Sequence, residues 1–148
     1  MEMMNRVAVI TGGSGGIGKA MAKAFLAEGA KAVVLADLNA DAVATAAKEI
    51  GCSGKTCDVT DEAQVAALVN ETIAEHGKID LFCSNAGAGG AGLLTDAENE
   101  VWQMQWELHV MSHLYAARAV LPSMIERGEG YLLNTASAAS LIVFYMFA

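Results

Sequence analysis

Short apolar segments alternate with longer amphipathic segments along most of the chain. The first apolar segment, residues 6–11, is rich in β-branched side chains and runs directly into a group of glycines. The residues that follow place apolar side chains at helical spacing, namely Ile17, Met21, Ala24 and Phe25. The pattern therefore predicts a strand, a glycine-rich turn and a helix, in that order.

The same unit then recurs. Residues 31–37 read as a buried strand, Asn39 is placed to cap a helix that runs through Ile50, and Gly51 ends it. Residues 53–59 predict a third, weaker strand, after which Thr60 opens the next helix and residues 79–85 form a fourth strand. The apolar face predicted for that helix comprises Val65, Leu68, Val69, Thr72 and Ile73.

The last unit has the longest predicted helix. Thr95 and Glu98 have the spacing of a capping box, and the helical pattern continues to about Arg127, with a kink expected at Pro122. A fifth strand is predicted within residues 130–137. Trp102 and Trp106 share one helical face, which we interpret as core packing.

Strands that alternate with helices indicate right-handed crossovers and a parallel sheet covered on both faces. The predicted fold class is α/β, a doubly wound sheet of about five strands in three layers. No linker or repeat divides residues 1–148, so we expect a single domain. In such sheets ligands bind at the carboxyl ends of the strands.

Composition and charge limit the kinds of binding partner and the cellular location that we expect. The 148 residues carry a net charge of -8, and the nine basic side chains are scattered, which excludes a nucleic-acid surface. Cys52, Cys57 and Cys83 fit neither a redox pair nor a zinc site, so three free thiols and a cytoplasmic location are expected. The wholly apolar residues 141–148 are too few to span a membrane, so no membrane anchor is expected.

The glycines of residues 11–20 fit three phosphate-binding patterns. The nucleoside triphosphatase loop is excluded because Ala20 stands where a Ser or Thr should bind magnesium. The general dinucleotide fingerprint uses Gly13, Gly15 and Gly18, whereas the pattern T-G-x-x-x-G-x-G uses Thr11, Gly12, Gly16 and Gly18. Each pattern places backbone N–H groups at a helix N-terminus, where they bind an anion.

Asp37 ends the second predicted strand, nineteen residues after Gly18. A carboxylate at this place accepts hydrogen bonds from the adenosine ribose of a dinucleotide. It would also repel the phosphate of NADP, and neither Ser14 nor Leu38 supplies a compensating positive charge. The site therefore predicts NAD in preference to NADP. The alternative is that Asp37 only caps a helix.

The chain resembles the short-chain dehydrogenase/reductase family. The resemblance rests on TGGSGGIG, LAD at 35–37, CDV at 57–59, NAG at 85–87, RAVLPSM and NTAS, in this order along nearly the whole chain. It selects the pattern T-G-x-x-x-G-x-G, so the glycines that matter are Gly12, Gly16 and Gly18 rather than Gly13 and Gly15. It implies a cofactor site made of Gly12, Ser14, Gly16, Ile17, Gly18, Asp37, Leu38, Asp58, Val59, Asn85, Ala86 and Gly87.

The resemblance assigns each group a part of the cofactor. Ser14 and Ile17 would line the pyrophosphate turn, and Asp37 with Leu38 the ribose. Asp58 with Val59 would contact the adenine, and residues 85–87 would lie under the nicotinamide half. For Asp58 the alternative is again a helix cap, beside Thr60.

The family's chemistry is hydride transfer between nicotinamide and a carbon that bears a hydroxyl, with a Tyr of a Y-x-x-x-K motif as acid/base. Ser137 matches the family's substrate-binding Ser, and His109 stands where the family usually has an Asn. The sequence ends before a Y-x-x-x-K motif, so this polypeptide is expected to be nearly inert. It would also lack the helix that forms much of the family's homo-oligomer interface. The bare edge of the fifth strand and the apolar residues 141–148 predict a poorly soluble or self-associating product.

Two alternatives to that enzyme are a non-catalytic nucleotide-binding or interaction module derived from the same fold and, more remotely, a membrane-anchored fragment. The small-molecule partner implied by the resemblance is an alcohol or carbonyl compound. His109 and His113 are four residues apart on a predicted helix, which is the spacing of metal ligands. Because the sequence offers no nearby third ligand, we interpret them as helix-surface or helix-packing histidines and expect no metal.

Overall fold

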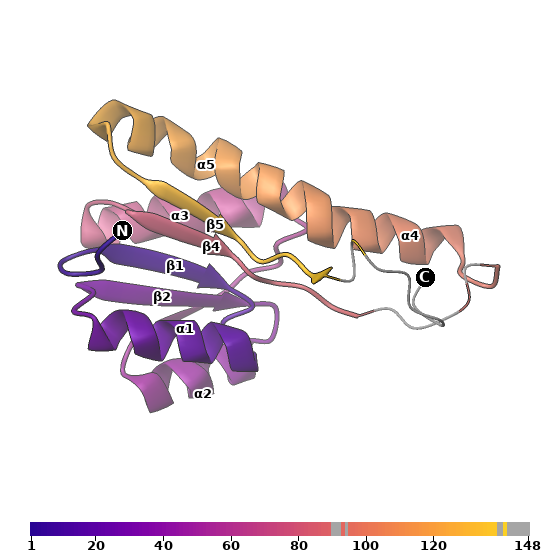
Figure 1. The fold of residues 1–148 in the computed structure, drawn as a ribbon, viewed down its shortest axis with the longest axis horizontal. Coiled ribbons are helices and arrows are strands. Elements are labelled where there is room, and N and C mark those ends of the chain that lie inside the picture. Colours follow the sequence, from indigo (N-terminus) through magenta and orange to yellow (C-terminus); the bar gives the residue numbers. More distant parts are fainter. Residues whose placement is uncertain (90–92, 94, 139–140, 142–148) are drawn as a thin grey trace.

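The fold is built around one parallel sheet. A computed structural model describes residues 1–89, 93, 95–138 and 141. The strands pair in the order β3-β2-β1-β4-β5, and each pair is parallel (Figure 1). Their bounds are β1 Val7–Thr11, β2 Ala32–Asp37, β3 Ser53–Thr56, β4 Leu81–Ser84 and β5 Tyr131–Asn134. The predicted α/β class and the five parallel strands are confirmed.

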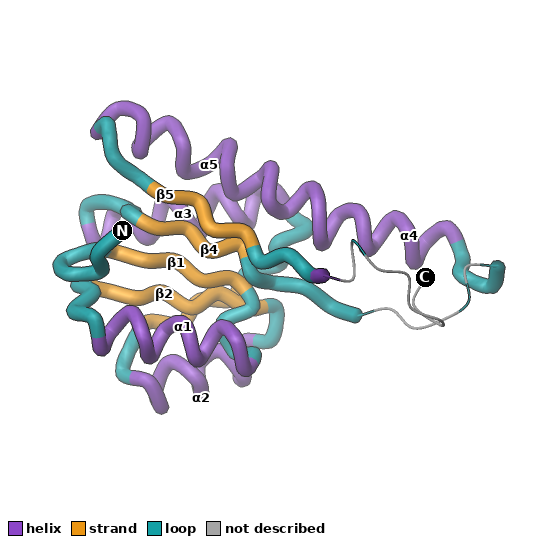
Figure 2. Tube along the Cα trace, viewed as in Figure 1, coloured by secondary structure: helices purple, strands orange, loops and turns teal. Residues whose placement is uncertain are grey.

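Helices cover both faces of the sheet (Figure 2). On one face lie α1 and α2, and on the other lie α3 and the long helical segment that ends in α5. The bounds are α1 Gly16–Ala27, α2 Ala40–Ile50, α3 Glu62–His76, α4 Asn99–Trp106, η1 Glu107–Met111 and α5 Ser112–Arg127. From β1 the chain adds β2 and β3 on one side of the sheet, and it then adds β4 and β5 on the other side. Such folds bind ligands at the place where the strand order reverses, which here lies between β1 and β4.

Alternate side chains of the buried strands supply two apolar cores. Ala8 and Ile10 of β1 pack with the α1 and α2 layer, whereas Val9 packs with α3 and α5. Phe82 of β4 joins Val9 in the second core, and both are fully buried. Because neighbours along a strand point to opposite faces, a sheet buried on both sides needs continuous apolar strands, as the sequence pattern indicates.

The predicted ends of α2 are confirmed, and the start of α3 is corrected. Asn39 caps α2 by accepting from the Ala42 N–H at 3.0 Å, and Gly51 ends it in the left-handed conformation. Asp61 caps α3 instead of Thr60, because its carboxylate accepts from the Ala63 N–H at 2.9 Å.

The predicted capping box at residues 95–98 is wrong. Helix α4 begins at Asn99, and Glu98 is its N-cap without a side-chain hydrogen bond. The Thr95 hydroxyl donates instead to the neighbouring Asp96 carboxylate at 2.8 Å. A local Asp acceptor thus competes successfully with the helix for the threonine side chain.

The long helix runs to Arg127 as predicted, but it contains a π-helical turn, η1, that the sequence did not indicate. Pro122 lies within α5, which continues through it from Ser112. A π turn inserts one extra residue per turn and often occurs at functional sites. Here it carries His109.

Ile17 lies on the open side of the predicted first helix, and the core packing predicted for two tryptophans is wrong. Helix α1 buries Gly18 and Ala22, whereas Ile17 is 62% exposed. Close packing of Gly18 on the glycine loop sets the rotation of the helix and turns Ile17 outward. Trp102 and Trp106 are 45% and 53% exposed, so they are not core residues. The part of their helix that carries them extends past the sheet, as Figure 1 shows.

Among the residues that the structure describes, no helix combines the length and the apolarity needed to cross a membrane. Residues 142–148 lie outside the described part of the chain. The expectation that this segment promotes self-association therefore stays a prediction.

Candidate functional site

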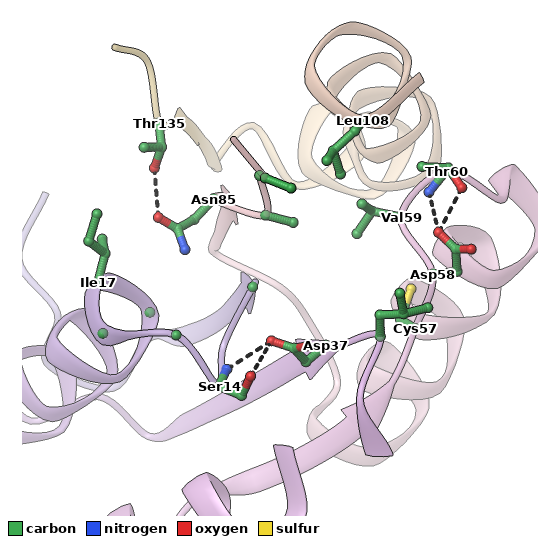
Figure 3. Close-up of a pocket in the computed structure, with 18 of the residues that line it drawn as sticks. Ser14, Ile17, Asp37, Cys57, Asp58, Val59, Thr60, Asn85, Leu108 and Thr135 are labelled. Carbon is green, nitrogen blue, oxygen red and sulfur yellow. Dashed lines mark hydrogen bonds between the residues drawn. The ribbon is translucent and has the colours of Figure 1, made fainter. Parts of the chain in front are cut away.

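A cavity of about 620 Å³ opens at the carboxyl ends of the strands. All twelve residues that the family resemblance assigned to the cofactor line this one cavity (Figure 3). Seven further residues complete its lining, and the sequence interpretation did not include them: Gly15, Cys57, Thr60, Ala88, Met104, Leu108 and Thr135. Strand order brings together segments that are far apart in sequence, because β1 lies between β2 and β4.

The glycine loop is shaped by close backbone packing. Gly12 has φ +63°, and a Cβ there would lie 2.9 Å from Ala86 Cα. A Cβ on Gly18 would collide with the Gly12 carbonyl oxygen, so the helix reaches the loop only without a side chain. Packing against β2 also requires a glycine at position 13, because a Cβ there would lie 2.7 Å from Leu35 Cβ. The sequence interpretation, in which Gly12 and Gly16 matter rather than Gly13, is corrected on this point.

Gly16 differs from these positions. A Cβ there would meet nothing within 4 Å, and Gly16 lines the cavity at the first residue of α1. Protein packing therefore does not demand a glycine, whereas a ligand that closely approaches the backbone would. The first turn of α1 contains no acidic side chain, so its N–H groups and the positive end of the helix dipole remain available for an anion.

Asp37 binds the glycine loop directly. Its Oδ2 accepts from the Ser14 backbone N–H at 3.0 Å and from the Ser14 hydroxyl at 2.7 Å. Its Oδ1 accepts from the Asn39 N–H at 3.3 Å. Because Asn39 caps α2, the alternative interpretation of Asp37 as a helix cap is wrong.

Asp58 is held in a similar way within its own turn. Its Oδ1 accepts from both the backbone N–H and the hydroxyl of Thr60, at 2.9 and 2.7 Å. Asp61 is the cap of α3, so Asp58 is not a helix cap either. Figure 3 shows Asp37 and Asp58 on adjacent parts of the cavity wall, with Val59 beside them.

A hydrogen-bonded chain fixes the Asn85 segment across three strands. The buried Thr11 hydroxyl accepts from the N–H groups of Asn85 and Ala86 at 3.0 and 3.1 Å. Asn85 Nδ2 donates to the Thr11 carbonyl at 3.1 Å, and its Oδ1 accepts from the Thr135 hydroxyl at 2.9 Å. Thr135 follows β5 directly, and only its place in NTAS could have indicated this contact from sequence.

His109 lies beside the same segment. Its Nε2 is 3.0 Å from the Ala88 carbonyl oxygen, so the ring donates from Nε2. A Cβ on Gly87 would lie 2.9 Å from His109 Cε1, which means that the imidazole fills the space a side chain would need. His109 thus contacts Gly87 and Ala88, which line the cavity, but it is not itself one of the described lining residues.

Ser137 lies three residues beyond the end of β5 and is exposed. It is not one of the described residues that line the cavity, although Thr135, two residues earlier, is. The predicted placement of this serine on the fifth strand is therefore wrong, because β5 ends at Asn134.

Burial changes the pKa values of His113, Cys57 and Cys83. Burial, with the nearby His109, lowers the pKa of His113, which favours a neutral imidazole. Burial, followed by the carboxylates of Asp58 and Asp61, raises the pKa of Cys57 to about 11, and burial raises that of Cys83 to about 12. Both thiols are therefore protonated near neutral pH. Within the described residues no group of three or more His, Cys, Asp or Glu side chains could hold a metal ion.

The fold and the lining of the cavity together indicate the class of protein. A parallel sheet ordered 3-2-1-4-5, a glycine turn that leads into α1 and a carboxylate at the end of β2 are the features of doubly wound nucleotide-binding proteins. The chain belongs to the short chain dehydrogenase family, whose sequence profile matches residues 6–148.

Similar proteins include several dehydrogenases. The chain is 38% identical over 136 residues to 2-dehydro-3-deoxy-L-rhamnonate dehydrogenase (NAD(+)) of Sphingomonas sp. SKA58, covering 90% of this chain and 54% of the relative. It is 34% identical over 145 residues to 7alpha-hydroxysteroid dehydrogenase of Escherichia coli K12, covering 95% and 56%.

Its structure resembles that of a short chain dehydrogenase/reductase from Burkholderia phymatum in complex with NAD, with a TM-score of 0.94, 31% identity and coverage of 99% and 54%. The chain thus spans little more than half the length of these relatives.

Proposed function

We propose that this chain forms the NAD-binding part of a dehydrogenase that interconverts an alcohol and a carbonyl compound. The observation that carries the proposal is the single cavity lined by the glycine loop, the N-terminus of α1, Asp37 and residues 85–87. Family membership and the NAD found in a similar solved structure support it.

The residues of the cavity suit the successive parts of the dinucleotide. N–H groups of Gly16 and Ile17 at the positive end of α1 would bind the pyrophosphate, and its close approach explains a glycine at position 16. Asp37 would accept from the adenosine ribose. Asp58 and Val59 would contact the adenine. We propose NAD over NADP because no described residue of the lining is basic and Asp37 would repel a 2′-phosphate.

Residues 85–87 would support the nicotinamide half. Asn85 and Ala86 donate their N–H groups to the Thr11 hydroxyl, and Asn85 accepts from Thr135, so these two residues are held in place before the cofactor binds. When bound, the nicotinamide would accept or supply a hydride. The Ser137 hydroxyl would hydrogen-bond the substrate oxygen. His109 would position the segment under the reacting ring through its bond to Ala88.

Two features support a reducing compartment and a small-molecule partner. All three cysteines are free thiols, which fits the cytoplasm. The relatives named above act on a sugar acid and on a steroid, so the substrate class we propose is a secondary alcohol of moderate size or its carbonyl counterpart.

The test combines two measurements on the same preparation. Quenching of protein fluorescence by NADH and by NADPH measures binding, and absorbance at the nicotinamide wavelength measures oxidation of a panel of secondary alcohols. We expect NADH to bind more tightly than NADPH. Absence of NADH binding would refute the proposal. Binding without turnover is the result expected of a chain that is nearly inert by itself, so it supports the cofactor site and not a catalytic role. Loss of any turnover in Ser137→Ala, with NADH binding unchanged, would support the role of that serine.

A further inference from the structure

The two edges of the sheet differ in how they are protected. The strand order places β3 at one edge and β5 at the other (Figure 1). Strand β3 reads SGKT, and its Lys55 Nζ lies 2.9 Å from the carboxylate of Glu71 and 2.6 Å from that of Glu75. Strand β5 reads YLLN and has no charged residue. Polar and charged side chains on an edge strand prevent it from pairing with another chain, so β3 is protected and β5 is not.

The backbone of β5 has hydrogen-bonding groups on its outer side. The N–H groups of Tyr131 and Thr135 donate to carbonyl groups at the two ends of β4, both at 2.9 Å. Because alternate residues of a strand turn their N–H and C=O groups to opposite sides, those of Leu132 and Asn134 point away from β4. Among the strands that the structure describes, none pairs with this side of β5.

The side chains along this edge are apolar on both faces of the sheet. Leu132 packs against the core under α5, so Tyr131 and Leu133 point to the other face, where they are 52% and 38% exposed. A groove of about 250 Å³ lies between β5 and the end of α5, and Ile125 in its wall is 73% exposed. The exposed apolar surface therefore continues from the strand onto the neighbouring helix, as is typical of an interaction site.

Charge near β5 is balanced locally, although the chain as a whole carries a net charge of -8. The charged side chains that precede the strand have partners within the same molecule. Glu129 forms an ion pair with Arg6 at 2.5 Å, and Arg127 Nη1 lies 3.4 Å from Asp80 Oδ1. Two copies of the chain repel each other over most of their surface, but they can approach at this edge without bringing like charges together.

We propose that two copies of this chain associate through β5, in antiparallel orientation about a two-fold axis at Leu132. This arrangement is self-complementary, because the outward N–H and C=O groups of Leu132 then bond those of the same residue in the second copy. It also places Tyr131 of each copy opposite Leu133 of the other, as a cross-strand pair of an aromatic and an aliphatic side chain. The two sheets become one continuous sheet. No residue of β5 lines the cavity, so the inference does not depend on NAD binding.

The experiment replaces the facing side chains by charges. Tyr131→Lys/Leu133→Lys sets positive charges opposite one another, and Tyr131→Glu/Leu133→Glu does the same with negative charges. Sedimentation velocity is run at about 100 µM, because an interface this small binds weakly. We expect the wild type to be mainly dimeric and each double variant to be monomeric. An equimolar mixture of the two variants should form dimers again, since opposite charges then face each other.

Val101→Lys/Val110→Lys is the matched control. These side chains are 41% and 42% exposed on α4 and η1, away from β5, so this variant should dimerise like the wild type. A monomeric wild type, a dimeric Tyr131→Lys/Leu133→Lys, a mixture that stays monomeric or a control that dissociates would each overturn the inference.

Hydrogen exchange of the wild type tests the strand pairing without any substitution. The Leu132 amide faces solvent in the single chain and is hydrogen-bonded in the dimer, so its exchange should slow at least about tenfold as the protein concentration rises from about 1 to about 100 µM. Equal exchange at the two concentrations would overturn the inference, whether or not the charged variants fold.

Discussion

Asp80 offers the sharpest test of how this fold is held together. It lies just before β4, at the end of the sheet away from the cavity, and its side chain is fully buried. Its Oδ2 accepts from the Val7 N–H at 2.8 Å, while its Oδ1 lies 3.3 Å from Arg6 Nη1, 3.0 Å from Lys78 Nζ and 3.4 Å from Arg127 Nη1. One carboxylate thus joins β1, β4 and the end of α5.

Asp80→Asn keeps the size of the side chain and an acceptor for Val7, but removes the charge. Lys78 and Arg127 then lose this counter-ion, while Arg6 keeps its ion pair with Glu129. Removing one member of a buried ion pair costs about 3–5 kcal/mol. The partner side chains are 25%, 31% and 26% exposed, so water compensates part of this loss. We expect the free energy of unfolding to fall by about 2–4 kcal/mol.

Urea unfolding at neutral pH, followed by circular dichroism, measures the difference. Glu62→Gln is the control, because it breaks a pair with Arg118 in which both side chains are more than half exposed, and it should cost under about 1 kcal/mol. A loss of less than about 0.5 kcal/mol for Asp80→Asn, with an unchanged m-value, would refute the reasoning. NADH affinity should be unaffected, because the cavity lies at the opposite ends of the strands.

The pH dependence provides an independent check. Burial alone would raise the pKa of Asp80, but the Val7 N–H bond, Lys78 and Arg6 outweigh it and hold that pKa below its usual value. The unfolded chain therefore binds this proton more readily than the folded chain. The stabilisation is present above the ordinary pKa of an aspartate, near 4, and is lost as pH falls through the lower, folded value. The difference between wild type and Asp80→Asn should shrink accordingly in acid.

Two further predictions concern the cavity. Gly16→Ala should leave the melting temperature unchanged and weaken NADH binding at least about tenfold. Gly18→Ala should lower the free energy of unfolding by about 1–3 kcal/mol, because its Cβ would clash with Gly12. Equal effects of the two variants on the melting temperature would contradict the packing argument. Cys57 and Cys83 should react slowly with iodoacetamide in the folded protein at pH 8 and rapidly in urea, as mass spectrometry can show, because burial raises both pKa values; rapid labelling of the folded protein would refute this.

Local sequence was sufficient for the elements and for much of the cavity. The alternation of apolar strands with amphipathic helices predicted five parallel strands, and these are present. Asn39 and Gly51 mark the ends of α2 because capping is a contact between residues close in sequence. The residues expected at the carboxyl ends of successive strands line one cavity, since parallel strands present those ends at the same edge.

Local pattern was insufficient where competing contacts are close in energy. Thr95 had the spacing of a capping residue, but Asp96 took its hydroxyl. Trp106 had the spacing of a core residue, but its helix extends beyond the sheet and leaves it 53% exposed. Amphipathic spacing shows that side chains share a helical face, and only the neighbouring elements decide whether that face is covered.

By itself, the sequence determined the fold class, the position of the glycine turn and the carboxylate at the end of β2, because these depend on periodicity and on residues near one another in the chain. Only the tertiary structure decided that Asp37 binds the Ser14 hydroxyl and that Thr11 and Thr135 bind Asn85. It also decided that Asp80 forms ion pairs with basic side chains from other parts of the chain. Those contacts join residues on different elements, and hydrogen bonds at about 3 Å form only when strand order and register bring the partners together.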